Sequence, residues 1–130
     1  MWILLEQVTD ISSAQLLAMN SVPVEIIPAP PAGYVIVPVG LSWVVRPGSV
    51  PYSGNSSITT HYGGGAAAAY TPFAPGLNAT VPTVGSALAP SGAAAAASTL
   101  AGNVTASVSA PFTTGNGTLS VLCKYYTKKL

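Results

Sequence analysis

Glycine and proline cut this chain into short segments, and this restricts its fold more than any other feature. The sequence contains 13 glycines and 12 prolines, several of them gathered in residues 28–33 (PAPPAG), 46–48 (RPG) and 63–65 (GGG). Both residue types are unfavourable inside helices and central strands, so such runs predict turns. The segments between them are too short for long helices, which favours a fold of short strands.

Five of the segments alternate apolar and polar residues, as strands with one buried face do. The strongest runs from Tyr34 to Val45, where every second residue from Val35 onward is apolar and predicts one unbroken apolar face. Within it, Pro38 and Gly40 indicate an edge position or a bulge, because proline donates no hydrogen bond to a neighbouring strand. The other four segments are residues 23–27, 56–62, 104–110 and 119–126.

The last two of these segments are predicted to pair as a β-hairpin. Residues 113–118 (TTGNGT) lie between them, and the two glycines there can adopt the positive φ angles of tight hairpin loops. The paired strands would present one apolar face, to which Cys123 belongs. A buried, unreactive thiol is the expected state of a cysteine at such a position.

One short helix is predicted within residues 9–20. Ser12 or Ser13 can cap its N-terminus, and residues 14–19 (AQLLAM) are good helix formers. Asn20 can end the helix, which would then be only about two turns long.

An apolar run opens the sequence: Met1, Trp2, Ile3, Leu4 and Leu5. It is much shorter than the ~20 apolar residues that a membrane-spanning helix needs. No basic segment precedes it and Glu6 follows at once, which is unlike a signal peptide. We expect residues 1–8 to be an assembly arm or a first strand, and the five apolar residues to form an interface with neighbouring proteins.

Together these features predict a single, mainly all-β domain over residues 1–130. The expected architecture is a β-sandwich, jelly-roll-like fold or small barrel with one short N-terminal helix. Residues 63–102 are of low complexity, rich in Ala, Gly, Pro, Ser and Thr, and are expected to form long loops. A short strand near residues 67–73 and a helical turn within residues 93–100 are expected inside this segment.

Charged side chains make up only 5% of the residues, against about 25% in ordinary domains. A nearly neutral surface promotes association, so we expect self-association, with a trimer favoured because closed symmetry covers exposed strand edges. The alternative is a monomer kept soluble by Ser, Thr and Asn. Arg46 is the only basic residue before Lys124, so neither a nucleic-acid nor a membrane partner is expected.

The residue types that catalysis needs are too few and too scattered to predict an active site. His61 is the only histidine, Cys123 the only cysteine, and Glu6, Asp10 and Glu25 the only acidic residues. Their spacing matches neither a metal site nor a nucleophile with its base. We therefore predict that the protein is not an enzyme and has no metal or other cofactor.

Four asparagines lie in the Asn-x-Ser/Thr pattern that accepts N-linked glycans: Asn55, Asn78, Asn103 and Asn116. Because Ser and Thr are so abundant in this chain, chance matches are common. We expect these residues to serve as polar groups of turns and strand edges. A secreted glycoprotein subunit stays an alternative.

Two stretches resemble small structural proteins of tailed-bacteriophage virions. They are residues 13–17 (SAQLL) with Asn20, residues 23–30 (PVEIIPAP) and Gly33, and residues 115–121 (GNGTLSV) with Tyr125 and Tyr126. The resemblance spans residues 12–62 and 103–127 and leaves out the low-complexity middle. It implies a virion protein, such as a capsid decoration (cement) protein or a head or tail fibre component, and it carries over no catalytic residue.

The resemblance and the low charge imply the same role. A decoration protein would sit on the capsid surface of a virion assembled in the host cytoplasm, where it would bind and stabilise the lattice of the major capsid protein or contact other virion proteins. The alternative is a receptor- or glycan-binding module of a phage fibre or a cell-surface assembly, in which exposed aromatic residues would form the binding surface.

Overall fold

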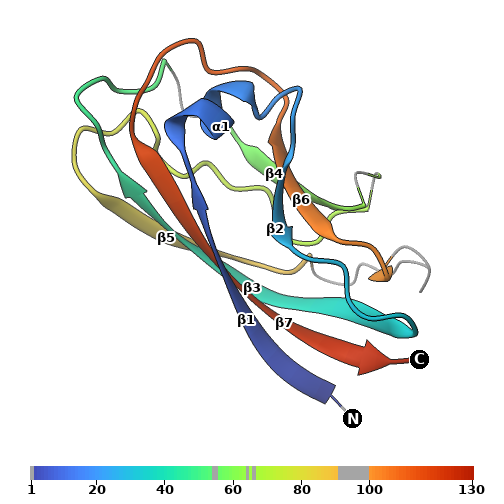
Figure 1. Ribbon diagram of the computed structural model, residues 1–130. Helices are drawn as coiled ribbons and strands as arrows, with labels where there is room; N and C mark the ends of the chain where they lie inside the picture. The colour runs from blue at the N-terminus through green and yellow to red at the C-terminus, as the bar shows by residue number, and fades with distance from the viewer. Residues whose placement is uncertain (1, 54–55, 64, 66, 91–99) are drawn as a thin grey trace.

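The computed structural model describes residues 2–53, 56–63, 65, 67–90 and 100–130 (Figure 1). About half of these residues lie in strands. The elements, in chain order, are β1 (Trp2–Ile11), α1 (Ser13–Ala18), β2 (Val24–Ile27), β3 (Tyr34–Arg46), β4 (Ile58–Tyr62), β5 (Thr83–Leu88), β6 (Val104–Val108) and β7 (Thr118–Lys129).

The strands form two antiparallel sheets that pack face to face. The larger has the order β1-β7-β3-β5 and the smaller the order β2-β6-β4. The helix α1 lies at one end of the pair, and the start of β1 and the end of β7 extend past the smaller sheet at the other end (Figure 1). The prediction of a mainly β sandwich with one short helix is confirmed.

The core lies between the sheets and follows the strand alternation. Every second residue of β7, from Leu119 to Thr127, is buried, and Val104, Ala106 and Val108 of β6 are buried from the opposite side. Burial of one such aliphatic side chain contributes roughly 1.5–3 kcal/mol. The alternating polar residues of β6 are left on the outside of the smaller sheet.

The predicted hairpin of the last two strands is wrong. β6 pairs with β2 and β4, whereas β7 pairs with β1 and β3. The connection between them crosses from one sheet to the other, and Phe112 within it is buried with its ring 5.3 Å from that of Tyr52. The two apolar faces therefore oppose each other across the core and do not form one surface.

A bulge breaks the apolar face that was predicted to be continuous along β3. The pairing with β7 shifts between Pro38 and Gly40, so that Val39 has no partner and is 40% exposed. Before the bulge Ile36 faces the core, and after it Leu41 and Val45 do. The extra residue reverses the alternation, because each strand position points to the opposite side from the one before it.

The low-complexity middle contributes more than loops. Thr83–Leu88 form β5, which the sequence did not predict, and residues 69–77 bury Ala69, Tyr70, Phe73 and Leu77 in the core. Where a strand was expected, two isolated bridges join Phe73 and Ala68 to β4. The helical turn expected within residues 93–100 falls almost wholly outside the described residues.

The helix α1 is shorter than residues 9–20 because residues 9–11 belong to β1. Its predicted cap is confirmed. The Ser12 hydroxyl accepts a hydrogen bond from the Gln15 backbone N–H at 3.2 Å, and the Gln15 side chain accepts one from the Ser12 backbone N–H at 2.9 Å. This reciprocal pair satisfies two N–H groups that a helix start otherwise leaves free.

Buried groups surround Cys123 on β7. Its side chain is fully buried, and burial raises the pKa of the thiol to about 12. The neighbouring Tyr70 is also fully buried, and its hydroxyl donates a hydrogen bond to the Lys124 backbone carbonyl at 2.8 Å. The expected buried thiol is thus observed.

Gly85 on β5 leaves room for the half-buried Trp43 of β3. A Cβ at Gly85 would clash with the Trp43 ring, which is held by stacking on Phe73 at 4.5 Å and by donating from Nε1 to the Pro75 carbonyl at 3.3 Å. We expect Gly85→Ala to lower the free energy of unfolding by about 1–3 kcal/mol. Urea denaturation followed by circular dichroism measures it.

The matched control is Ser86→Ala at the exposed neighbouring position, for which a change within about 0.5 kcal/mol is expected. Equal stability of the Gly85→Ala variant and the natural chain would show that Trp43 is not held as described.

The Cys123 thiol is expected to resist a thiol-specific disulfide reagent in the folded protein at pH 8. With its pKa raised to about 12 by burial, only about one thiol in ten thousand is ionised at that pH, and the thiolate is the reactive form. In urea the same thiol should react rapidly. A fast reaction of the native protein would contradict the burial of Cys123.

Candidate functional site

The few residues with potential chemistry lie apart from one another. His61 is on the outer side of β4, where its Nε2 lies 3.2 Å from the Thr59 hydroxyl oxygen. The carboxylate of Glu25 accepts a hydrogen bond from the Asn103 side chain at 2.8 Å, and Cys123 lies inside the core. The structure does not bring His61, Cys123 and an acid together.

In the part of the chain that the structure describes, neither a metal-ligand cluster nor a membrane-spanning helix occurs. No group of three or more His, Cys, Asp or Glu side chains there could hold a metal ion. Among the same residues, no helix has the length and apolar character needed to cross a membrane.

Two of the Asn-x-Ser/Thr asparagines hold loops or strands together. The Asn116 side chain accepts a hydrogen bond from the Val50 N–H at 2.9 Å and donates one to the Ser49 hydroxyl at 2.9 Å. Asn103 holds Glu25, as described above. Asn78 is exposed, and Asn55 lies outside the described residues.

The outer face of the larger sheet is the surface with the most unusual character. Inward-facing residues of β7 have odd numbers, so its even-numbered residues and those opposite them on β1 point outward. The exposed fractions of Trp2, Leu4 and Val8 on this face are 55%, 52% and 62%, and those of Val84 and Leu88 on β5 are 73% and 71%. Large apolar side chains thus remain in solvent across the sheet.

A small apolar depression lies in the middle of this outer face. It has a volume of about 160 Å³ and is lined mainly by Val8, Val44 and Leu122, which come from three neighbouring strands. The alternation over residues 119–126 assigns Leu122 and Tyr126 to the polar side of their strand, and Val84 and Leu88 lie in the segment expected to form loops. The apolar residues of the outward positions were the signal that could have revealed this face.

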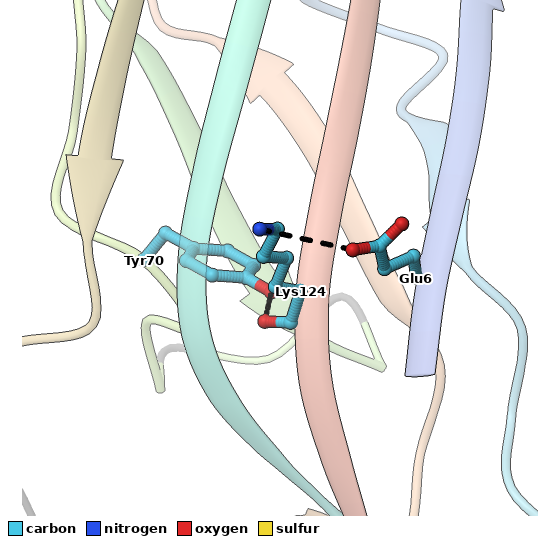
Figure 2. A network of polar contacts seen from close by, with 3 residues as sticks. All are labelled: Glu6, Tyr70 and Lys124. Atoms are coloured by element: carbon cyan, nitrogen blue, oxygen red, sulfur yellow. Dashed lines mark hydrogen bonds and ion pairs between the residues drawn. The ribbon is translucent and has the colours of Figure 1, made fainter. Parts of the chain in front are cut away.

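Five of the seven charged side chains also lie on the outer face: Glu6, Asp10, Arg46, Lys124 and Lys128. Lys124 Nζ lies 3.7 Å from a Glu6 carboxylate oxygen, and the backbone carbonyl of Lys124 accepts the hydrogen bond from the Tyr70 hydroxyl (Figure 2). Ser120 donates to Asp10 at 2.6 Å and accepts from Arg46 at 2.6 Å. Glu6 and Lys124 thus form an ion pair, and Ser120 bridges Asp10 and Arg46.

The first residues of β1 expose side chains on both sides of the sheet. Ile3 and Leu5 point to the inner side, yet they are 44% and 37% exposed, because the smaller sheet does not reach this end (Figure 1). The structure places residues 2–8 in a strand that pairs with β7, which is the second of the two alternatives for this segment. Met1 lies outside the described residues.

An aromatic pair marks the same end of the outer face. The rings of Trp2 and Tyr126 meet edge to face with centroids 5.7 Å apart, and Lys128 Nζ lies 5.7 Å from the centre of the Trp2 ring. An ammonium group over an indole is attracted by the negative face of the ring. These contacts fix Trp2 in place although more than half of its surface is exposed.

Comparison with known proteins gives a likeness of fold. No family model matches the sequence, and no similar curated protein was found. A chain in the capsid asymmetric unit of cyanophage Pam1 superposes with a TM-score of 0.55 at 15% identity, over 96% of this chain and 84% of that chain.

Two further solved structures are similar only at lower scores. A chain from the capsid of Ralstonia phage GP4 gives a TM-score of 0.40 at 17% identity, over 95% of this chain and 83% of that one. A chain of the Nora virus structure gives a TM-score of 0.36 at 9% identity, over 98% of this chain and 56% of that one. Of these three likenesses, the one to the Pam1 chain bears on the fold of this protein.

Proposed function

We propose that this protein is a non-catalytic structural component of a virion. The observation that carries the proposal is the outer face of the larger sheet, where large apolar side chains remain exposed in a chain with only 5% charged residues. Exposed apolar patches of this kind are typical of interaction surfaces. The fold shared with a chain of the cyanophage Pam1 capsid gives independent support.

Within that role, we propose a capsid decoration or cement protein that binds the lattice of the major capsid protein on the virion surface. A lattice presents many identical sites at high local concentration, so many individually weak contacts act together. Such contacts need a rigid, neutral and partly apolar face, and not a deep pocket. Because the charged side chains of the outer face have partners within that face, they would orient the docked protein with little electrostatic repulsion from the capsid.

Charge placed on β5 tests this role. Val84 and Leu88 are the most exposed apolar side chains of the outer face, so Val84→Asp with Leu88→Asp should leave the fold intact. We expect this double variant to lose at least about tenfold in affinity for shells of the major capsid protein of the same virus, because each charge must be desolvated at the contact. Co-sedimentation with the shells measures binding.

The matched control carries the same two added charges on the other side of the molecule, as Ser57→Asp with Ala68→Asp, both at exposed positions. It should bind shells as the natural chain does. Failure of the natural chain to bind, or equal binding by both double variants, would contradict the proposal.

The exposed pair of Trp2 and Tyr126 favours a second candidate, a receptor- or glycan-binding module. Aromatic rings held in a fixed geometry form the kind of platform on which sugar rings stack. For this candidate, a glycan would change the tryptophan fluorescence of the natural chain, and Trp2→Ala would abolish the change. An unchanged spectrum across a glycan panel would remove this candidate.

A further inference from the structure

The four strand edges of the sandwich differ in how open they are. In the larger sheet the outer strands are β1 and β5, and in the smaller sheet they are β2 and β4. Three of the four are protected in ways that natural proteins use against edge-to-edge pairing. Of the four edge strands β1 is the longest, with ten residues and no proline or glycine. Its Thr9 side chain donates to the Ile26 carbonyl of β2 at 3.4 Å, whereas along residues 2–8 no strand among the described residues pairs with its free side.

Each of the other edges is covered or shortened. Residues 67–73 cover β4, with four backbone hydrogen bonds between 2.7 and 3.1 Å. The edge of β2 has four residues, with Pro23 before it and Pro28 after it and a shift in its pairing. In β5 the six residues lie between Pro82 and Pro90, and the Leu88 carbonyl already accepts a hydrogen bond from the Thr71 N–H.

We propose that the free edge of β1 pairs with the β1 edge of a second copy of this chain, antiparallel and about a twofold axis normal to the sheet. Main-chain hydrogen bonds between the two strands would join the two larger sheets into one. The inference builds on the proposed structural role, since it gives that role its partner and its symmetry. It also revises the trimer expected from composition.

The symmetry follows from the number of open edges. A ring of three copies joined by strand pairing needs two different open edges on each copy, one for each neighbour. Only β1 is open among the described residues. When each copy has a single open edge, the backbone groups of that edge can pair with the same edge of a second copy across a twofold axis. No open edge then remains, so the assembly ends at two copies.

The side chains of β1 fit this pairing best when Leu4 lies on the axis. Residues opposite each other must then point to the same side of the joined sheet, which sets Leu4 against Leu4 and Ile3 against Leu5 of the second copy. The exposed side chains of Ile3, Leu4 and Leu5 are thus brought together on both faces of the sheet. A register centred on Glu6 would instead place two like charges opposite each other, which is destabilising.

Charge complementarity supports the same register. With Leu4 on the axis, Trp2 lies opposite Glu6 of the second copy. Lys128, whose Nζ lies over the Trp2 ring, is then about two strand spacings of ~4.8 Å from that residue, within the reach of a lysine side chain. Each Glu6 would lie between Lys124 of its own copy and Lys128 of the other.

The joined sheet would double the outer face. A twofold axis normal to the sheet keeps both outer faces on the same side, so that two copies of the apolar depression and of β5 face the same way. A dimer could then contact two neighbouring capsid subunits at once, which raises its apparent affinity without any new kind of contact.

Light scattering and sedimentation equilibrium of the free protein test the dimer without any capsid. We expect a mass of twice 13.0 kDa. Ile3→Lys with Leu5→Lys should raise the dissociation constant about a hundredfold or more, because four ammonium groups would meet at the joint. The control, Val84→Lys with Leu88→Lys on β5, carries the same charge and should stay dimeric. Circular dichroism verifies that both variants fold.

Cross-linking tests the register independently. Single cysteines at Ile3, Leu4 and Leu5 are oxidised mildly and followed on a non-reducing gel, with the buried Cys123 as the unreactive background. In the Leu4→Cys variant, the new cysteine should form a disulfide with the same cysteine of the second copy. When the Ile3→Cys and Leu5→Cys variants are mixed, a disulfide should form between one variant and the other. Absence of self-linking at Leu4 would overturn the register.

A monomer at all concentrations, a trimer, or loss of the dimer in the β5 control alone would overturn the proposed pairing. These outcomes are separate from capsid binding. A dimer that does not bind shells would contradict the decoration role but support the β1 pairing. A monomer that binds shells would support the decoration role but contradict the β1 pairing.

Discussion

The structure depends on β7, the strand that lies between β1 and β3 in the larger sheet. It pairs with both of these strands along nearly its whole length. Its inward residues, from Leu119 to Thr127, are buried in the core, and its outward residues, including Leu122 and Lys124, lie between those of β1 and β3 on the outer face. Because the same strand makes the core and the candidate surface, that surface is rigid, and a rigid surface loses little entropy on docking.

The sequence predicted strands well and strand partners poorly, for a physical reason. Alternation records which side of a strand is buried, and Ile58, Thr60 and Tyr62 of β4 are buried as their spacing indicates. It does not record which strand lies alongside. Glycines near residue 115 favoured a local hairpin, whereas β7 pairs with β1 from the other end of the chain, as in Glu6 opposite Lys124.

The candidate surface was predicted only where its signal was continuous in sequence. The apolar run that includes Trp2 and Leu4 was expected to contact neighbours, and the structure leaves these side chains exposed in β1. The residues between Val84 and Leu88 are glycine, serine and alanine, so this strand could not be told from a loop. The exposed position of Leu122 could not be predicted for a different reason. Both sides of β7 carry apolar residues, which weakens the alternation between an apolar and a polar side.

The scarcity of charge has a second aspect, which is where the few charges lie. Five of the seven share the outer face with the exposed apolar residues. The Glu6–Lys124 pair is about half exposed on each side, so it contributes little to stability, on the order of 1 kcal/mol or less. Charges that do little for the fold yet gather on the most apolar face are better explained by recognition. In the proposed role they would set the orientation of a partner, while the apolar side chains would supply the binding free energy.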